Sequence, residues 1–117
     1  MIEIRHKTSG EVILYVEAES LREADLRGAN LTCADLHDLD LTGAQLRHTH
    51  LAKAALNGAK LCHADLRGAE LYGADLTGAD LRGTDLRGIS EYATRFRGVQ
   101  HDAQTQWPAD FDVALRT

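Results

Sequence analysis

The sequence of 117 residues has few of the features that mark membrane, secreted or disulfide-rich proteins. It contains one proline and two cysteines, and aromatic residues make up only 5% of the chain. No apolar run approaches the length of about 18 residues that a membrane-spanning helix needs. The N-terminus also lacks the apolar segment of a secretory signal. We therefore expect a cytoplasmic chain that does not enter membranes and has a thin, aliphatic core.

An excess of basic residues is also missing, because acidic side chains outnumber Lys and Arg by 18 to 13. The net charge of −5 gives no general attraction to nucleic acid, so direct nucleic-acid binding is not expected. Cys33 and Cys62 form no CxxC pair, which leaves zinc and redox motifs without support. Isolated thiols in a cytoplasmic protein are most often reduced.

The dominant feature of the sequence is a strict five-residue repeat. Leucine occupies every fifth position from Leu21 to Leu86 without a gap. Two residues before these leucines, from position 24 to position 84, alanine is present except at Leu39, Thr49 and Thr84. Chance does not place fourteen leucines in register, so the repeat defines the fold.

A period of five fits neither a helix, with apolar spacing of three and four, nor a strand, with alternation by two. It fits short extended segments separated by right-angle turns, so that four units close a square coil and coils stack about 4.8 Å apart. Leucine then points inward from the middle of each side, and alanine points inward near each corner. Sixteen central positions from 21 to 96 predict about four coils. The predicted core includes Leu26, Leu31, Leu36, Leu46, Leu51, Leu56, Leu66, Leu71, Leu76 and Leu86.

The placement of glycine supports these corners independently. Nine of the ten glycines lie two residues after a central position, where the third residue of a type II turn needs a positive φ angle. The single proline, Pro108, lies outside the repeats, where its missing N–H does not interrupt a ladder.

Units 24–28, 64–68 and 79–83 each read Ala-Asp-Leu-Arg-Gly and match the A(D/N)LXX signature of the pentapeptide repeat family. The resemblance extends over about residues 17–100. It implies an all-β fold, the right-handed quadrilateral parallel β-helix of that family. We expect a single domain over residues 1–117, with the coils at 17–100 between caps at 1–16 and 101–117.

Both ends of such a stack must be covered, because exposed leucines and strand edges favour aggregation. Alternating apolar residues at 2–4 and 12–16, on either side of a turn at 7–10, predict a β-hairpin cap. Near the other end, Glu91 occupies a central position, where burial of a lone carboxylate costs several kcal/mol. We expect either a bulge or register change there, or an edge coil that lets Glu91 reach solvent.

The C-terminal cap is predicted to be a short helix. Pro108 suits the first position of a helix, and Phe111 and Leu115 share one helical face. Trp107, Phe111 and Leu115 either cap the last coil within the chain or join two subunits. The resemblance keeps the second alternative open, because family members that mimic DNA form homodimers through a C-terminal apolar patch.

Stacking 20 residues per coil predicts which side chains form columns on the surface. On one side, an unbroken arginine column lies beside a mainly acidic one. The two columns form either an ion-pair lattice worth little energy per pair or a basic strip for an acidic partner. The arginines are Arg27, Arg47, Arg67 and Arg87, and the column beside them is Asp25, Gln45, Asp65 and Asp85.

On the next side, the same register places Tyr72 and Tyr92 in adjacent coils, where we expect their rings to stack. Exposed tyrosines anchor partners at many interfaces, while cross-strand packing is the alternative explanation. The two tyrosines and the four column arginines are the candidate partner-binding residues.

No catalytic, cofactor or metal site is predicted. The six histidines fall on different sides, corners or ends, so no three converge on a metal ion. The acids line outer columns, and a core filled with leucine leaves no interior pocket for a substrate. We therefore expect the chain not to be an enzyme and to hold no cofactor.

Two functions fit these expectations. The first is a structural scaffold or protein-interaction module whose partner is another protein. The second, which the resemblance implies, is a DNA mimic acting on a topoisomerase such as DNA gyrase. The small number of coils and the thirteen basic residues argue against mimicry.

Overall fold

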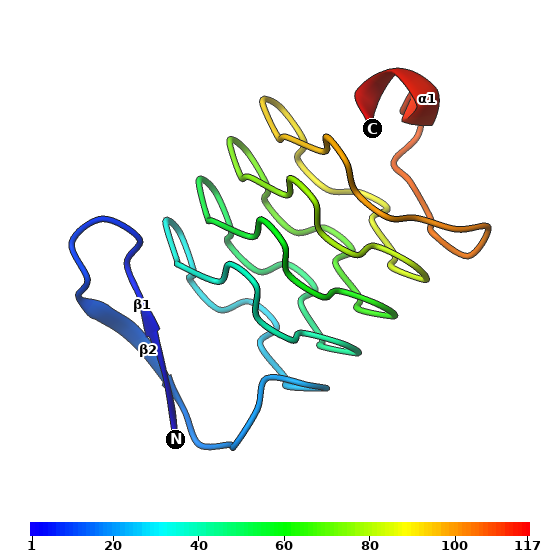
Figure 1. The fold of residues 1–117 in the computed structure, drawn as a ribbon. Helices are drawn as coiled ribbons and strands as arrows, with labels where there is room; N and C mark the ends of the chain where they lie inside the picture. Colours follow the sequence, from blue (N-terminus) through cyan, green and yellow to red (C-terminus); the bar gives the residue numbers. More distant parts are fainter.

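A computed structural model describes all 117 residues, and its repeats wind into a right-handed β-helix (Figure 1). Outside the coils, β1 (Ile2–Arg5) and β2 (Val12–Val16) form a hairpin at one end of the stack. The helix α1 (Val113–Arg116) lies at the other end. The predicted all-β fold, with a hairpin cap and a short helical cap, is confirmed.

Parallel bridges join successive coils at a spacing of 20 residues. They run from the pair Asp25 and Gln45 to the pair Asp80 and Gln100, which is consistent with about four coils. At the bridge between Gln45 and Asp65, the backbone N–H of Asp65 donates to the carbonyl of Ala44 (3.0 Å). Residues 20 apart therefore lie side by side, which is the register that the surface columns require.

The central leucines form one continuous core. All ten core leucines expected from the sequence are buried, and Phe96 takes the same central position in the last regular unit. Burial of each leucine stabilises the fold by about 2 kcal/mol relative to exposure. The corner alanines from Ala34 to Ala79 are also buried, because only a small side chain fits beside the turn.

Threonine replaces a corner alanine where its hydroxyl finds a backbone partner. Thr84 is fully buried, and its Oγ1 donates to the carbonyl of Leu61 in the preceding coil (2.6 Å). Thr49 and Thr94 make the equivalent hydrogen bond. A hydroxyl can therefore enter this core without a desolvation penalty. Leu39, the remaining exception to alanine, is partly buried against the core near the hairpin end.

The third residue of each turn, at every fifth position from 23 to 98, has a positive φ angle, as a type II turn requires. Nine of these sixteen positions are glycine, with φ between 67° and 73°. The other seven carry side chains and adopt the same left-handed conformation, as His63 does at φ 60°. The turn around His63 is closed by Ala64 N donating to Leu61 O (2.9 Å).

The hairpin continues the hydrogen bonding of the first coil. One edge of β1 pairs antiparallel with β2. On its other edge, Arg5 O accepts from Asp35 N (2.8 Å), and Lys7 N donates to Cys33 O (2.8 Å). Ile4 is buried in the same core as the leucines, so the hairpin covers the open end of the stack.

One extra residue after Gln100 shifts the register of the last coil. The bridge from Asp85 goes to Gln106, 21 residues later instead of 20. Thr105 therefore takes the corner position one residue later than the strict repeat predicts, and its Oγ1 donates to Leu81 O (2.8 Å). Trp107 follows in the central position.

The C-terminal helix begins later than the sequence predicts. Asp112 is its N-cap, and the Asp112 carboxylate accepts a hydrogen bond from Leu115 N (3.0 Å). The prediction that Pro108 begins the helix is wrong, because Pro108 lies in a turn closed by Phe111 N donating to Pro108 O (3.2 Å). Since Trp107 still belongs to the last coil, the chain must cross the end of the stack before a helix forms.

Three aromatic rings cover the last coil. Trp107 and Phe111 stack with their centroids 4.8 Å apart, and Phe96 meets both rings edge-on. The expectation that Phe111 and Leu115 share a helical face is wrong, because Phe111 precedes the helix and packs on the core. The side chain of Leu115 is 80% exposed.

Glu91 keeps its central position without a bulge. Thr94 N donates to Glu91 O (3.1 Å), the same hydrogen bond that closes the regular corners. The Glu91 carboxylate reaches the edge of the stack and pairs with Arg116 of α1 (2.9 Å). Of the two alternatives expected for Glu91, the edge coil that lets its carboxylate reach solvent is the one observed. The register change lies further along the chain, after Gln100.

Candidate functional site

The candidate site is a surface, because aliphatic side chains fill the inside of the coil. Leucine and alanine supply most of the buried residues between the two caps. No buried side-chain nitrogen or oxygen lacks a hydrogen-bond partner. The hollows in the molecule are open depressions near its two ends.

The tyrosine stack is present where the register predicts it. The rings of Tyr72 and Tyr92 lie 5.7 Å apart between centroids, with an angle of 11° between their planes. Tyr72 is 45% exposed and Tyr92 is 76% exposed. Neither hydroxyl makes a hydrogen bond within the chain. The two side chains thus form an ordered aromatic surface whose polar ends are free.

The arginine column consists largely of ion pairs within single units. Arg27 donates from Nε and Nη2 to the two carboxylate oxygens of Asp25 (2.8 and 2.7 Å). Arg67 binds Asp65 in the same forked way, and Arg87 binds Asp85. The hydrogen bonds from Arg27 lower the pKa of Asp25 to about 2.

Arg47 is the exception in this column. Its neighbour two residues earlier is Gln45, which carries no charge, and Arg47 makes no salt bridge or side-chain hydrogen bond. The two adjacent coils contain Asp25 and Asp65, whose carboxylates are already bound by Arg27 and Arg67 (both 2.7 Å). The column is therefore an ion-pair lattice with a single unpaired guanidinium, that of Arg47.

The side of Leu61 and Leu81, next to the arginine column, carries a further forked pair and a thiol. Arg82 donates to Asp80 from Nε and Nη2, and these hydrogen bonds lower the pKa of the Asp80 carboxyl well below its usual range. Burial raises the pKa of the adjacent Cys62 thiol. A thiol whose pKa is raised is a poor nucleophile near neutral pH.

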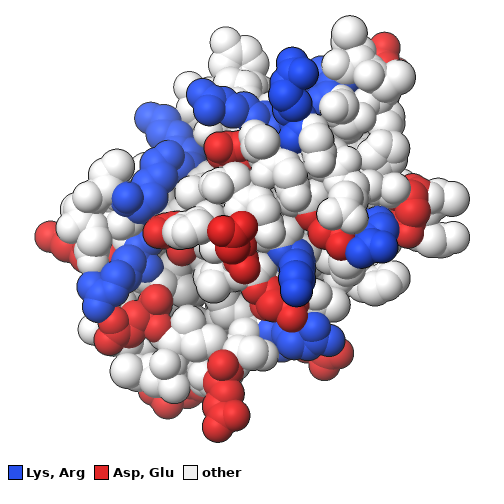
Figure 2. Space-filling view, viewed as in Figure 1, with Lys and Arg blue, Asp and Glu red and all other residues white.

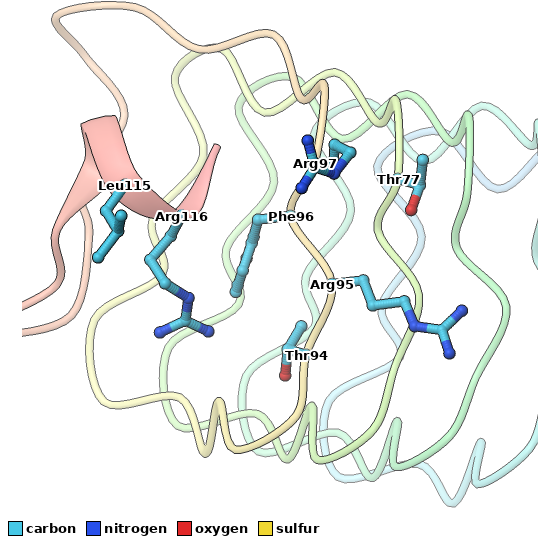
Figure 3. A pocket seen from close by; sticks show the side chains of 7 residues that line it. All are labelled: Thr77, Thr94, Arg95, Phe96, Arg97, Leu115 and Arg116. Atoms are coloured by element: carbon cyan, nitrogen blue, oxygen red, sulfur yellow. The ribbon is translucent and has the colours of Figure 1, made fainter.

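The structure also forms a depression that the sequence reasoning missed. It lies between the last regular coil and α1, has a volume of about 400 Å³, and is shown in Figure 3. Its lining contains three arginines and no acid: Thr77, Thr94, Arg95, Phe96, Arg97, Leu115 and Arg116. The repeat register places Arg95 and Arg97 outside on either side of Phe96, but only α1 makes their surroundings concave.

Charges of both signs are mixed over the face seen in Figure 2, with basic side chains gathered beside the C-terminal end. No group of three or more His, Cys, Asp or Glu residues lies close enough together to hold a metal ion. The single short helix cannot cross a membrane.

A family model of pentapeptide repeats, in eight copies, matches residues 20–54 and 49–88, which is more than half of the sequence. The chain belongs to the pentapeptide repeat family. This agrees with the 20-residue ladder and with the leucine at every central position from Leu21 to Leu86. No curated protein matches the sequence.

Solved structures of other pentapeptide repeat proteins are similar to this chain. The protein alr5209 from Nostoc Pcc 7120 is 32% identical, with 81% of this chain and 82% of that chain covered and a TM-score of 0.42. Rfr23 from the cyanobacterium Cyanothece 51142 is 33% identical, with 71% and 63% covered and a TM-score of 0.35.

HetL, involved in heterocyst differentiation regulation in Nostoc sp. strain PCC 7120, is also 33% identical. The alignment covers 68% of this chain and 44% of HetL, with a TM-score of 0.35. The chain thus spans less than half of HetL and less than two thirds of Rfr23. Because these TM-scores are below 0.5, the family assignment rests on the matched repeats.

Proposed function

We propose that this pentapeptide repeat protein is a non-catalytic scaffold that binds another protein through the side carrying Tyr72 and Tyr92. The observation that carries the proposal is the exposed stack of these two rings. Tyrosine is enriched among residues that dominate binding energy at interfaces, because it buries a large ring and keeps a polar end. The backbone ladder beneath the stack holds both rings in place, which lowers the entropy lost on binding.

The charge chemistry of the faces supports a non-catalytic role. Asp65, Asp80 and Asp85 are held by arginine, and in each case the arginine hydrogen bonds lower the carboxyl pKa. A carboxyl group with a lowered pKa stays ionised at neutral pH and is a poor general acid. We also propose that the arginine column is structural, since three of its four guanidinium groups are bound by their own aspartates.

Affinity capture tests this function when the bait is varied at one surface at a time. Wild-type protein and the Tyr72→Ala/Tyr92→Ala variant are incubated with extract of the native cell, and the bound proteins are compared by quantitative mass spectrometry. We expect at least one protein to be retained by the wild type and lost with the tyrosine variant. A charge-reversed control, Arg47→Glu, should retain it. Identical protein sets on the wild-type and tyrosine baits would contradict the proposal.

DNA mimicry is the less favoured function. A mimic of duplex DNA needs a surface of consistently negative charge, whereas Asp25, Asp65 and Asp85 alternate with arginines on one side.

The cytoplasmic location predicted from the sequence and a homodimer through the C-terminal end both stay predictions.

A further inference from the structure

The C-terminal depression differs from the rest of the surface in the balance of its charges. The chain carries a net charge of −5, yet the lining of the depression holds three arginines and no carboxylate. Arg95 and Arg97 form no salt bridge or side-chain hydrogen bond, and Arg116 pairs with Glu91 at the edge (2.9 Å). Two guanidinium groups are therefore free to bind an anion.

The shape of the depression favours an extended ligand over a single small anion. In Figure 3 the guanidinium groups of Arg95, Arg97 and Arg116 point in different directions, so one phosphate or carboxylate does not meet all three. The exposed side chain of Leu115 lies at the same place and gives it an apolar wall. An extended segment carrying several carboxylates and an aliphatic side chain satisfies both features.

The depression lies one corner of the coil away from the side that carries the tyrosine stack. Tyr92 and Arg95 are three residues apart on the two sides of one corner, at Ala93. Tyrosine and arginine are the residue types enriched at the centres of interfaces. We propose that the depression binds an acidic segment of the partner protein, one corner away from the tyrosine stack; this inference rests on the proposed scaffold function and names the chemistry of the partner.

A synthetic probe tests the charge preference without knowledge of the partner. The probe is a fluorescein-labelled peptide in which pairs of glutamates alternate with single leucines, and its counterpart has lysine in place of glutamate. Fluorescence anisotropy is measured with the wild type, with Arg97→Glu, and with Arg47→Glu as a matched control. The control reverses an equally unpaired arginine outside the depression, so the overall change of charge is the same.

We expect saturable binding of the glutamate peptide that weakens as salt is added, because salt screens exposed charges. Arg97→Glu should weaken it about tenfold, since it places a like charge beside the peptide, and Arg47→Glu should change it less than about twofold. Leu115→Ser should weaken binding without changing its salt dependence. Equal losses in Arg97→Glu and Arg47→Glu, equal binding of the lysine peptide, or no saturable binding would overturn the inference. None of these results would affect the affinity-capture experiment with Tyr72 and Tyr92. The proposed scaffold function can therefore hold even where this inference fails.

Discussion

The imidazole ring of His63 lies over Gly83 in the next coil, so a Cβ atom added to Gly83 would meet Nδ1 of His63 at 2.4 Å. His48 and Gly68 have the same relationship, at 2.5 Å. In these two columns the imidazole of one coil thus occupies the space that a side chain at the glycine of the next coil would need. Glycine is required in these places for space as well as for its positive φ angle.

Gly83→Ala should therefore destabilise the fold more than Gly78→Ala. Both positions have positive φ, which costs an L-residue about 1 kcal/mol, but an added Cβ at Gly78 meets nothing within 4 Å. At Gly83 the His63 ring must rotate away, which we expect to add about 1 kcal/mol. Urea unfolding measures both values, and His63→Ala in the Gly83→Ala background should recover the difference. Equal losses at the two glycines would contradict this packing.

The buried hydroxyl of Thr84 gives a second test. Thr84→Val keeps the volume but places a methyl group against Leu61 O, so we expect a loss of about 1 kcal/mol in the free energy of unfolding. Thr84→Ser keeps the hydroxyl and should retain the hydrogen bond. If valine is as stable as threonine in urea unfolding, the hydroxyl contributes nothing to the core.

Much of this arrangement follows from the sequence, because a period of five fixes which side chains point inward and which residues are neighbours 20 positions apart. The stack of Tyr72 on Tyr92 is a direct consequence of that register. The insertion after Gln100 was not predicted, since no residue type marks an extra residue in a turn. A spacing of 21 between Thr84 and Thr105 is the only trace of it in the sequence.

The C-terminal depression could not be predicted for a different reason. Arg95 and Arg97 are recognisable as surface residues, but the concave shape comes from where α1 lies against the last coil. That placement depends on contacts between distant residues, such as Arg116 with Glu91 (2.9 Å). The helical pattern alone predicted that Leu115 shares a face with Phe111, whereas the helix begins after Phe111 and Leu115 is exposed.

The C-terminal cap should loosen when Arg116 is replaced by alanine. Arg116 pairs with Glu91 and lies over the ring of Phe111, 4.9 Å from its centroid. Loss of both contacts should cost about 1 kcal/mol locally and expose Trp107. We expect a red shift of tryptophan fluorescence and faster hydrogen exchange in α1. Leu115→Ala, which changes an exposed neighbour, should leave both signals unchanged.

Acid should destabilise the fold through the forked aspartates. Their pKa values are lower in the folded chain than in the unfolded chain, so their stabilisation is present above pH about 4 and is lost as pH falls toward 2. Asp80 is the least exposed of the pairs, with 12% of its side chain accessible, and Asp25 is among the most exposed. Unfolding measured across this range should show a shallower pH dependence for Asp80→Asn than for Asp25→Asn. The same slope in both variants and the wild type would show that the forks do not set acid stability.

Gyrase supercoiling should be unaffected by this protein. The carboxylates that would imitate phosphates are bound by arginines at Asp25, Asp65, Asp80 and Asp85. We therefore expect the same supercoiled product from purified DNA gyrase with or without micromolar protein. If the wild-type protein inhibits supercoiling, and the Arg47→Glu variant still inhibits it, the result would favour the DNA mimic over the scaffold.

Site-specific photo-crosslinking tests most directly whether one side of the coil is the partner-binding surface. Benzoylphenylalanine is placed at Tyr92 in one variant and at Gln100 in another, and both are irradiated in cells. Gln100 is also exposed and lies in the last regular coil, but on the opposite side. The account predicts a discrete crosslinked protein from position 92 and none from position 100. Crosslinks of equal yield from both positions, or from position 100 alone, would contradict it.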